Sequence, residues 1–133
     1  MSVKFNKVLL VDDDSINNYL SQEIISEAKI AEEVVLLTDG QQALDYLEEL
    51  NANAPDPSIN LLILLDLNMP VMDGFEFMEA LNSLEIRLDY VIVILTSSDN
   101  QRDLEKIKAY KIHDFISKPI TEEKLLSVFK SEQ

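Results

Sequence analysis

Residues 61–74 read LLILLDLNMPVMDG, an unbroken apolar run that stops at an aspartate and is followed by a turn containing proline. A continuous apolar run is typical of a strand in a parallel sheet that is covered on both faces. Asp73 stands three residues before Glu76, which is the spacing of a helix N-cap and its reciprocal partner. The stretch therefore predicts a buried strand, a turn that carries Asp66, and a helix that begins near Asp73.

Similar patterns alternate along the rest of the chain. Three more runs are apolar and rich in branched residues, and a further one is weaker: Val8–Val11, Val34–Leu37, Val91–Leu95 and, weakest, His113–Ser117. Helical spacing occurs between the runs, over residues 16–28, 40–50, 73–84, 101–110 and from 121 onward. Alternating strands and helices require right-handed crossovers and place helices on both faces of a parallel sheet. The sequence therefore predicts an α/β fold, a doubly wound three-layer sandwich.

Two of the helices have informative faces. In the first, apolar residues recur every three or four positions, which predicts one inward stripe made of Ile16, Tyr19, Leu20, Ile24 and Ala28. The helix over residues 101–110 carries few apolar residues, which indicates a helix that moves or faces a partner.

Two boundaries of the second helix are also predicted. Thr38 precedes Gln41 at the spacing of a capping pair, so Thr38 is expected to cap the helix. Residues 51–60 include Pro55 and Pro57, which cannot continue a helix, so this segment is expected to be an exposed loop.

The composition limits the functional class. The 133 residues, 47% of them hydrophobic, suit one domain with its core over about residues 6–130, and we expect a stand-alone domain without an output domain. No apolar run approaches the roughly 20 residues that span a bilayer, and the N-terminus lacks a signal-peptide core, so a cytoplasmic protein without a membrane partner is expected. The absence of cysteine excludes disulfides and thiolate sites. The net charge of −14 argues against direct nucleic acid binding.

Polar residues follow the predicted strands. They are Asp12, Asp13 and Asp14 after the first strand, Asp66 after the third, Thr96 and Ser97 after the fourth, and Lys118 after the fifth. In doubly wound sheets the ligand site lies at the carboxyl ends of the strands. Converging carboxylates repel one another unless a cation neutralises them, and Mg²⁺, with Mn²⁺ as a substitute, favours such oxygen ligands.

This set of residues suits phosphoryl transfer. A carboxylate can act as a nucleophile toward phosphorus, and Asp66 is the best-placed candidate. Lys118 and the hydroxyl of Thr96 would neutralise charge on the phosphoryl oxygens. Taken singly, Asp12 and Asp13 could instead cap a helix near Ser15, and Lys118 could be an ordinary solvated lysine. Their joint occurrence at four strand ends favours a site.

Four motifs carry a resemblance to a known family. They are VDD at 11–13, LDLNMPVMDG at 65–74, LTS at 95–97 and SKP at 117–119. In this order they resemble the receiver domains of two-component response regulators, over nearly the whole chain. The resemblance implies a CheY-like, flavodoxin-like (βα)5 fold with strand order 2-1-3-4-5.

The resemblance also implies a role for each residue of the acidic site. Asp66 would accept the phosphoryl group. Asp13 would bind Mg²⁺ directly, Asp12 would act through coordinated water, and the backbone carbonyl of Asn68 would complete the protein's share of the metal ligands. Lys118 would pair with the phosphoryl group.

The same resemblance implies a conformational switch. Thr96 and Phe115 would form the switch pair, and Pro119 would follow a cis peptide bond. Asp14 is interpreted as a bystander, because the family needs only two acidic residues there. The pair Lys111 and Ile112 departs from the small residues that are common before the fifth strand.

The implied function is a signalling module and not an enzyme. A sensor histidine kinase or a histidine phosphotransfer protein would donate the phosphoryl group. The face formed by helix 4, strand 5 and helix 5 would then bind an unknown downstream protein, with the chain a monomer or a weak phosphorylation-dependent dimer.

Three other functions are weaker. The first is a receiver that docks without phosphorylation. The second is an aspartyl-nucleophile phosphatase of the haloacid dehalogenase type, but it would need an acid or base where Asn68 stands. The third is a carrier of FMN, whose phosphate Asp12, Asp13 and Asp14 would repel.

Overall fold

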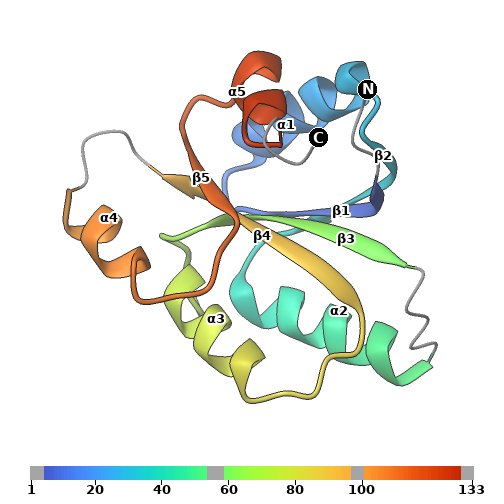
Figure 1. The fold of residues 1–133 in the computed structure, drawn as a ribbon, viewed down its shortest axis with the longest axis vertical. Helices are drawn as coiled ribbons and strands as arrows, with labels where there is room; N and C mark the ends of the chain where they lie inside the picture. Colours follow the sequence, from blue (N-terminus) through green and yellow to red (C-terminus); the bar gives the residue numbers. More distant parts are fainter. Residues whose placement is uncertain (1–4, 54–58, 97–100, 130–133) are drawn as a thin grey trace.

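The computed structural model describes residues 5–53, 59–96 and 101–129. Five parallel strands form one sheet in the order β2-β1-β3-β4-β5 (Figure 1). Their bounds are β1 Phe5–Val11, β2 Ala31–Leu37, β3 Asn60–Asp66, β4 Asp89–Thr96 and β5 Asp114–Ser117. The five predicted strands and their order are confirmed, including the weak fifth.

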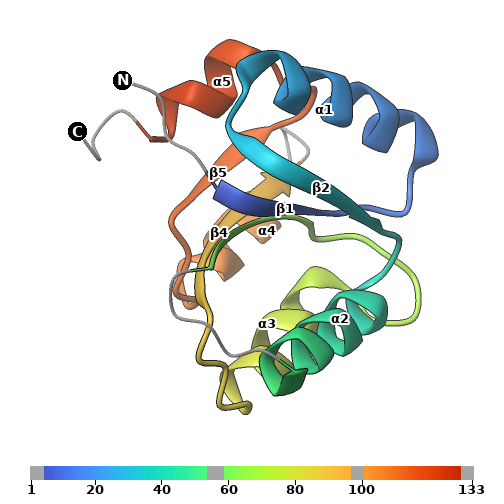
Figure 2. The same ribbon diagram turned by 90° about the vertical axis from the view of Figure 1, so that its right-hand side faces the viewer.

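The helices cover both faces of the sheet. They are α1 Ser15–Ala28, α2 Gly40–Asn53, α3 Gly74–Asn82, α4 Gln101–Ile107 and α5 Glu122–Ser127. Helices α1 and α5 lie on one face, and α2 and α3 lie on the other (Figures 1 and 2). Helix α4 contributes Ile107 to the core on the side of α2 and α3. The predicted three-layer sandwich is confirmed.

Strand β3 shows why its apolar run is unbroken. All five side chains from Leu61 to Leu65 are completely buried. Successive side chains of a strand point to opposite faces. Leu61, Ile63 and Leu65 therefore pack in the core beneath α2 and α3, while Leu62 and Leu64 pack in the core beneath α1 and α5. A strand between two helical layers has no face left for polar residues.

The predicted inward face of α1 was wrong for its first half. Ile16, Tyr19 and Leu20 are 70%, 62% and 50% exposed. The buried residues are instead Asn18, Ser21 and Ile25, whereas Ile24 and Ala28 are partly buried against the core as expected. Because two of the inward residues are polar, the apolar periodicity pointed to the wrong side of the helix.

The predicted cap of α2 was wrong by one residue. The N–H of Gln42 donates to Asp39 Oδ1 at 2.9 Å, so Asp39 caps the helix in place of Thr38. The N–H of Thr38 instead donates to Gln42 Oε1 at 3.0 Å. Two capping-type residues stand side by side here, and spacing alone cannot choose between them.

The end of α2 also lies later than predicted. The helix continues to Asn53, so residues 51–53 are not loop. Asn51 Nδ2 donates to the carbonyl of Glu85 at 2.9 Å, and its Oδ1 accepts from the N–H of Arg87 at 2.8 Å. These bonds tie the last turn of the helix to the segment before β4. Pro55 and Pro57 lie outside the described residues.

The predicted cap of α3 is confirmed, and Thr121 caps α5. The N–H of Glu76 donates to Asp73 Oδ1 at 2.9 Å, and the N–H of Asp73 donates to Glu76 Oε1 at 3.0 Å. The N–H of Lys124 donates to Thr121 Oγ1 at 3.1 Å. Within 5–53, 59–96 and 101–129, none of the helices combines the length and the apolar character that crossing a bilayer requires.

The α3 cap leads to a stability prediction. Asp73→Ala removes the acceptor for the Glu76 N–H and leaves that donor without its partner, so the free energy of unfolding should fall by about 1 kcal/mol. Asp73→Ser keeps a hydrogen-bond acceptor, so its free energy of unfolding should fall by only a few tenths of about 1 kcal/mol. Urea unfolding of the two variants measures the difference. Equal unfolding midpoints for Asp73→Ala and wild type would contradict the prediction.

Candidate functional site

The carboxyl ends of the strands bring four of the predicted residues together. Asp12 follows β1, Asp66 ends β3, Thr96 ends β4, and Lys118 follows β5. The Lys118 ammonium lies 3.0 Å from Asp12 Oδ2 and 3.3 Å from Asp66 Oδ1. Parallel strands end at the same edge of a sheet, so residues 106 positions apart in sequence can form an ion pair.

Three carboxylates share this edge. Asp12, Asp13 and Asp66 each offer an oxygen, and the three oxygens lie within 4.8 Å of one another. Asp12 and Asp66 are buried, at 2% and 6% exposure, whereas Asp13 is exposed. Clustered anionic oxygens, two of them withdrawn from water, form a donor set that fits a hard divalent cation such as Mg²⁺.

The crowding changes the proton affinity of the central residues. Burial, reinforced by the negative charge of Asp12, raises the pKa of Asp66 to about 6, and Lys118 partly opposes the rise. For Lys118, burial acts to lower the pKa, but the charges of Asp66 and Asp12 outweigh it and raise the pKa above its ordinary value. Lys118 is therefore a cation held beside Asp66, a carboxylate that keeps its proton to a higher pH than an ordinary aspartate does.

Asp12 is fixed by two hydrogen bonds from the start of α1. The N–H of Asp14 donates to Asp12 Oδ1 at 2.9 Å, and Asn18 Nδ2 donates to the Asp12 carbonyl at 2.8 Å. Sequence reasoning did not find Asn18. The sequence did contain one indication of its role, because Asn18 is a polar residue among the apolar residues of a helix that directly follows the acidic residues at the end of β1.

Asp14 has a structural role. Its side chain accepts hydrogen bonds from the N–H groups of Ile16 and Asn17, so it is the N-cap of α1. The capping role considered for Asp12 and Asp13 therefore belongs to Asp14, and the carboxylates of the other two face the site.

The turn after Asp66 is packed between two glycines. A Cβ on Gly74 would lie 2.8 Å from the Asp66 carbonyl oxygen, and one on Gly40 would lie 2.7 Å from the Met72 carbonyl oxygen. The N–H of Gly40 donates to that Met72 oxygen at 3.0 Å. Both helix starts therefore approach the turn more closely than any side chain would allow. The N–H of Asn68 lies 3.5 Å from Asp66 Oδ1, a long contact, and the role of the Asn68 carbonyl stays a prediction.

Thr96 and Phe115 differ in their surroundings. The Thr96 hydroxyl is buried, and among the residues that the structure describes it has no hydrogen-bond partner. Phe115 is 44% exposed. A buried hydroxyl without a partner is costly unless a further group accepts or donates there. Ser97 lies outside the described residues. The predicted cis peptide bond before Pro119 is confirmed.

A family model then decides the identity: the response regulator receiver domain matches residues 8–130. The chain belongs to this family. Response regulator Rcp1 of Synechocystis sp. is 34% identical over 108 residues, which are 80% of this chain and 70% of that protein. The crystal structure of a two-component response regulator from Cytophaga hutchinsonii is 32% identical, with a TM-score of 0.80 and 96% of each chain covered.

A third relative shares the fold. The receiver domain of a Pseudomonas aeruginosa sensor histidine kinase is 24% identical, with a TM-score of 0.75 and 96% of each chain covered. That structure has a magnesium ion coordinated in its active site cleft. Family membership confirms a CheY-like receiver of two-component signalling, which is a signalling module and not an enzyme. Its acidic pocket of Asp12, Asp13 and Asp66 beside Lys118 is consistent with a phosphoacceptor receiver.

Proposed function

We propose that this receiver accepts a phosphoryl group on Asp66 from a phosphohistidine donor and changes its surface in response. The observation that carries the proposal is the Lys118 ammonium, which lies 3.3 Å from Asp66 Oδ1 in a pocket with two further carboxylates. Asp66 is the last residue of β3, and its carboxylate is buried and lies beside this cation.

The chemistry at Asp66 is a displacement at phosphorus. A carboxylate oxygen of Asp66 forms the new P–O bond while the P–N bond to the donor imidazole breaks, and the imidazole takes the electron pair. Lys118 neutralises charge on the phosphoryl oxygens, and the Thr96 hydroxyl, buried and without a partner among the described residues, donates to one of them. The phosphoryl group brings more negative charge than the Asp66 carboxylate carried, so the buried pocket needs cations such as Lys118 beside it to hold the acyl phosphate.

Asp12, Asp13, Asp66 and the Asn68 carbonyl would hold Mg²⁺, with Mn²⁺ as a substitute. When bound, the ion neutralises the carboxylates and the incoming phosphoryl oxygens. The support is the donor set of this chain, three carboxylate oxygens within 4.8 Å. The magnesium ion of the Pseudomonas aeruginosa receiver agrees with it, although that likeness is one of fold.

Receiver domains act with histidine kinases in phosphorelays, and hybrid kinases carry receivers related to this chain. We therefore take a sensor histidine kinase or a histidine phosphotransfer protein as the donor. Phe115, 44% exposed on β5, would turn inward when Thr96 moves to the phosphoryl group, which changes the α4-β5-α5 face for a downstream protein or a weak dimer.

Intact mass after incubation with acetyl phosphate tests the proposal. One added phosphoryl group in the presence of Mg²⁺, and none after chelation, is expected. The reaction is sampled at short times so that a short-lived acyl phosphate is caught. If no adduct forms under these conditions, the chain is a receiver that docks without phosphorylation.

Metal binding should depend on pH through Asp66. Its pKa of about 6 means that, in the protein without metal, Asp66 is protonated at lower pH and must lose that proton to bind Mg²⁺. Affinity should therefore fall below about pH 6, by up to roughly tenfold per pH unit. Calorimetric titration with Mg²⁺ from about pH 7 to about pH 5 measures this. An affinity that does not change over this range would show that Asp66 is not protonated there.

A further inference from the structure

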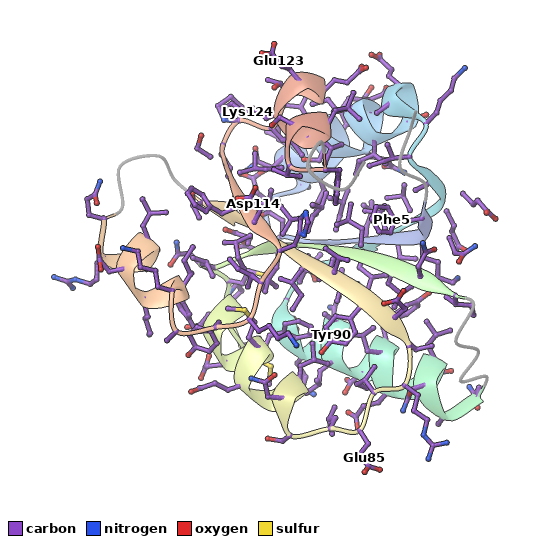
Figure 3. All side chains as sticks on the ribbon, viewed as in Figure 1. Phe5, Glu85, Tyr90, Asp114, Glu123 and Lys124 are labelled. Atoms are coloured by element: carbon purple, nitrogen blue, oxygen red, sulfur yellow. The ribbon has the colours of Figure 1, made fainter. Side chains whose placement is uncertain are left out.

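Lys124 holds the backbone on both sides of Lys118. Its ammonium lies 3.0 Å from the carbonyl oxygen of Ser117 and 3.0 Å from that of Pro119. These two residues flank Lys118 in the sequence. Lys124 lies on the side of α5 that faces the connection from β5 (Figure 3). One cation therefore fixes the main chain from which a second cation reaches the acidic site.

The position of β5 explains why a side chain is needed there. The N–H of Lys118 donates to the Thr96 carbonyl at 2.7 Å, so the backbone of Lys118 faces β4. Successive residues of a strand direct their backbone groups to opposite sides, so the Ser117 carbonyl faces away from β4. The described part of the sheet has no strand beyond β5. The ammonium of Lys124 supplies the donor that a neighbouring strand would otherwise provide.

The base of this contact is anchored in the core. The N–H of Lys124 donates to Thr121 Oγ1, which caps α5. The next residue, Leu125, is completely buried in the core beneath α1 and α5. The first turn of α5 is thus fixed both to the loop and to the core, and the Lys124 side chain extends from a defined position.

We propose that Lys124 is a positioning residue for phosphoryl transfer, because it holds the Ser117 and Pro119 carbonyls and thereby places Lys118 against Asp66. This inference rests on the proposed function, which assigns Lys118 to the phosphoryl group. The Lys124 ammonium contacts the backbone carbonyls of Ser117 and Pro119. Lys124 therefore acts on the site through the backbone of Lys118. The long side chain of Lys118 meets both carboxylates, at 3.0 and 3.3 Å, only if its Cα is held in place.

Two variants of Lys124 and one control separate this role from a general effect of charge. Lys124→Met keeps the length of the side chain and removes its donors, whereas Lys124→Arg keeps donors and charge. The control is Lys108→Met, because Lys108 pairs only with its exposed neighbour Glu105 in the contacts of the described residues. Each protein is phosphorylated with acetyl phosphate at saturating Mg²⁺, and Mg²⁺ affinity is measured separately.

Lys124→Met should be phosphorylated about tenfold more slowly than wild type, since misplacing one charged group by a fraction of an ångström costs rate at this scale. Its Mg²⁺ affinity should be unchanged, because the metal-binding carboxylates stay in place. Lys124→Arg should restore most of the rate, and Lys108→Met should match wild type. Thermal unfolding shows whether each variant is folded, and Lys124→Gln replaces Lys124→Met if the latter is not.

A measurement without any phosphoryl donor tests the contact itself. The NMR signals of the Ser117 and Pro119 carbonyl carbons and of Lys118 Cε should move in Lys124→Met and not in Lys108→Met. If wild type takes no phosphoryl group, the proposed function fails, and these signals alone decide whether the contact exists. If wild type is phosphorylated but Lys124→Met is equally fast, or Lys124→Arg is equally slow, or the carbonyl signals stay unchanged, the positioning role is overturned.

Discussion

Asp66→Asn is expected to abolish phosphorylation completely while leaving the domain folded. The amide has nearly the shape of the carboxylate, but its oxygen is a far weaker nucleophile toward phosphorus. Intact mass after incubation with acetyl phosphate and Mg²⁺ measures the loss. Asp14→Asn is the matched control, because Asp14 caps α1 and should leave uptake of the phosphoryl group unchanged.

The same variant should be more stable than wild type when Mg²⁺ is absent. The pKa of Asp66 is higher in the folded protein than in the unfolded chain, so the folded protein binds the proton more tightly. Above about pH 6 the wild type therefore keeps an unfavourable buried charge, and Asn removes it, with a gain of about 1–3 kcal/mol at neutral pH. The gain should shrink as the pH falls from about 6 to about 4 and disappear below that, where Asp66 is protonated in both states. An adduct on Asp66→Asn would place the phosphoacceptor elsewhere.

Phe77→Ala should cause the largest loss of stability, about 3–5 kcal/mol. Phe77 lies on α3 and is completely buried in the core between this helix and the sheet, so truncation removes apolar burial and leaves a cavity among close-packed neighbours. Phe115→Ala is the matched comparison, since Phe115 is 44% exposed and should lose less than about 1 kcal/mol. Urea unfolding of both proteins gives the two values.

Comparing Phe77→Ala with Phe115→Ala also tests whether Phe115 belongs to the packed core or to the conformational switch. Phe115→Ala should keep the rate of phosphorylation of Asp66 and change only the response of the α4-β5-α5 face to it. A loss of stability at Phe115 as large as that at Phe77 would mean that the ring is already packed inward without a phosphoryl group. That result would contradict the exposed position and the proposed inward movement.

Sequence reasoning succeeded where burial is symmetric. A strand such as β3, covered on both faces, has no alternative to an apolar run, so its position followed directly from Leu61 to Leu65. The residues after each strand were then placed by topology, because all parallel strands end at one edge. This reasoning placed Asp12, Asp66, Thr96 and Lys118 at that edge, and the structure has them there.

Sequence reasoning failed where a polar side chain faces inward because it hydrogen-bonds a residue of the site. Asn18 is buried on α1 because it bonds to the Asp12 carbonyl, so the apolar residues Ile16, Tyr19 and Leu20 lie on the exposed side. Periodicity assumes that inward residues are apolar, and that assumption does not hold next to a polar pocket. The role of Lys124 had no local signal at all, because its partners are backbone carbonyls, which every residue has.

The two glycines that pack against the turn after Asp66 limit which substitutions this protein can tolerate. Gly40 and Gly74 are the only glycines in the chain, neither takes part in the proposed chemistry, and neither has a positive φ. A saturation mutagenesis screen should nevertheless find both positions as intolerant as Asp66 itself, since any side chain would push against the turn that carries the phosphoacceptor. Intolerance in such a screen would then reveal the geometry of the backbone as well as the chemistry of the pocket, and reading every intolerant position as a reactive residue would assign these two wrongly.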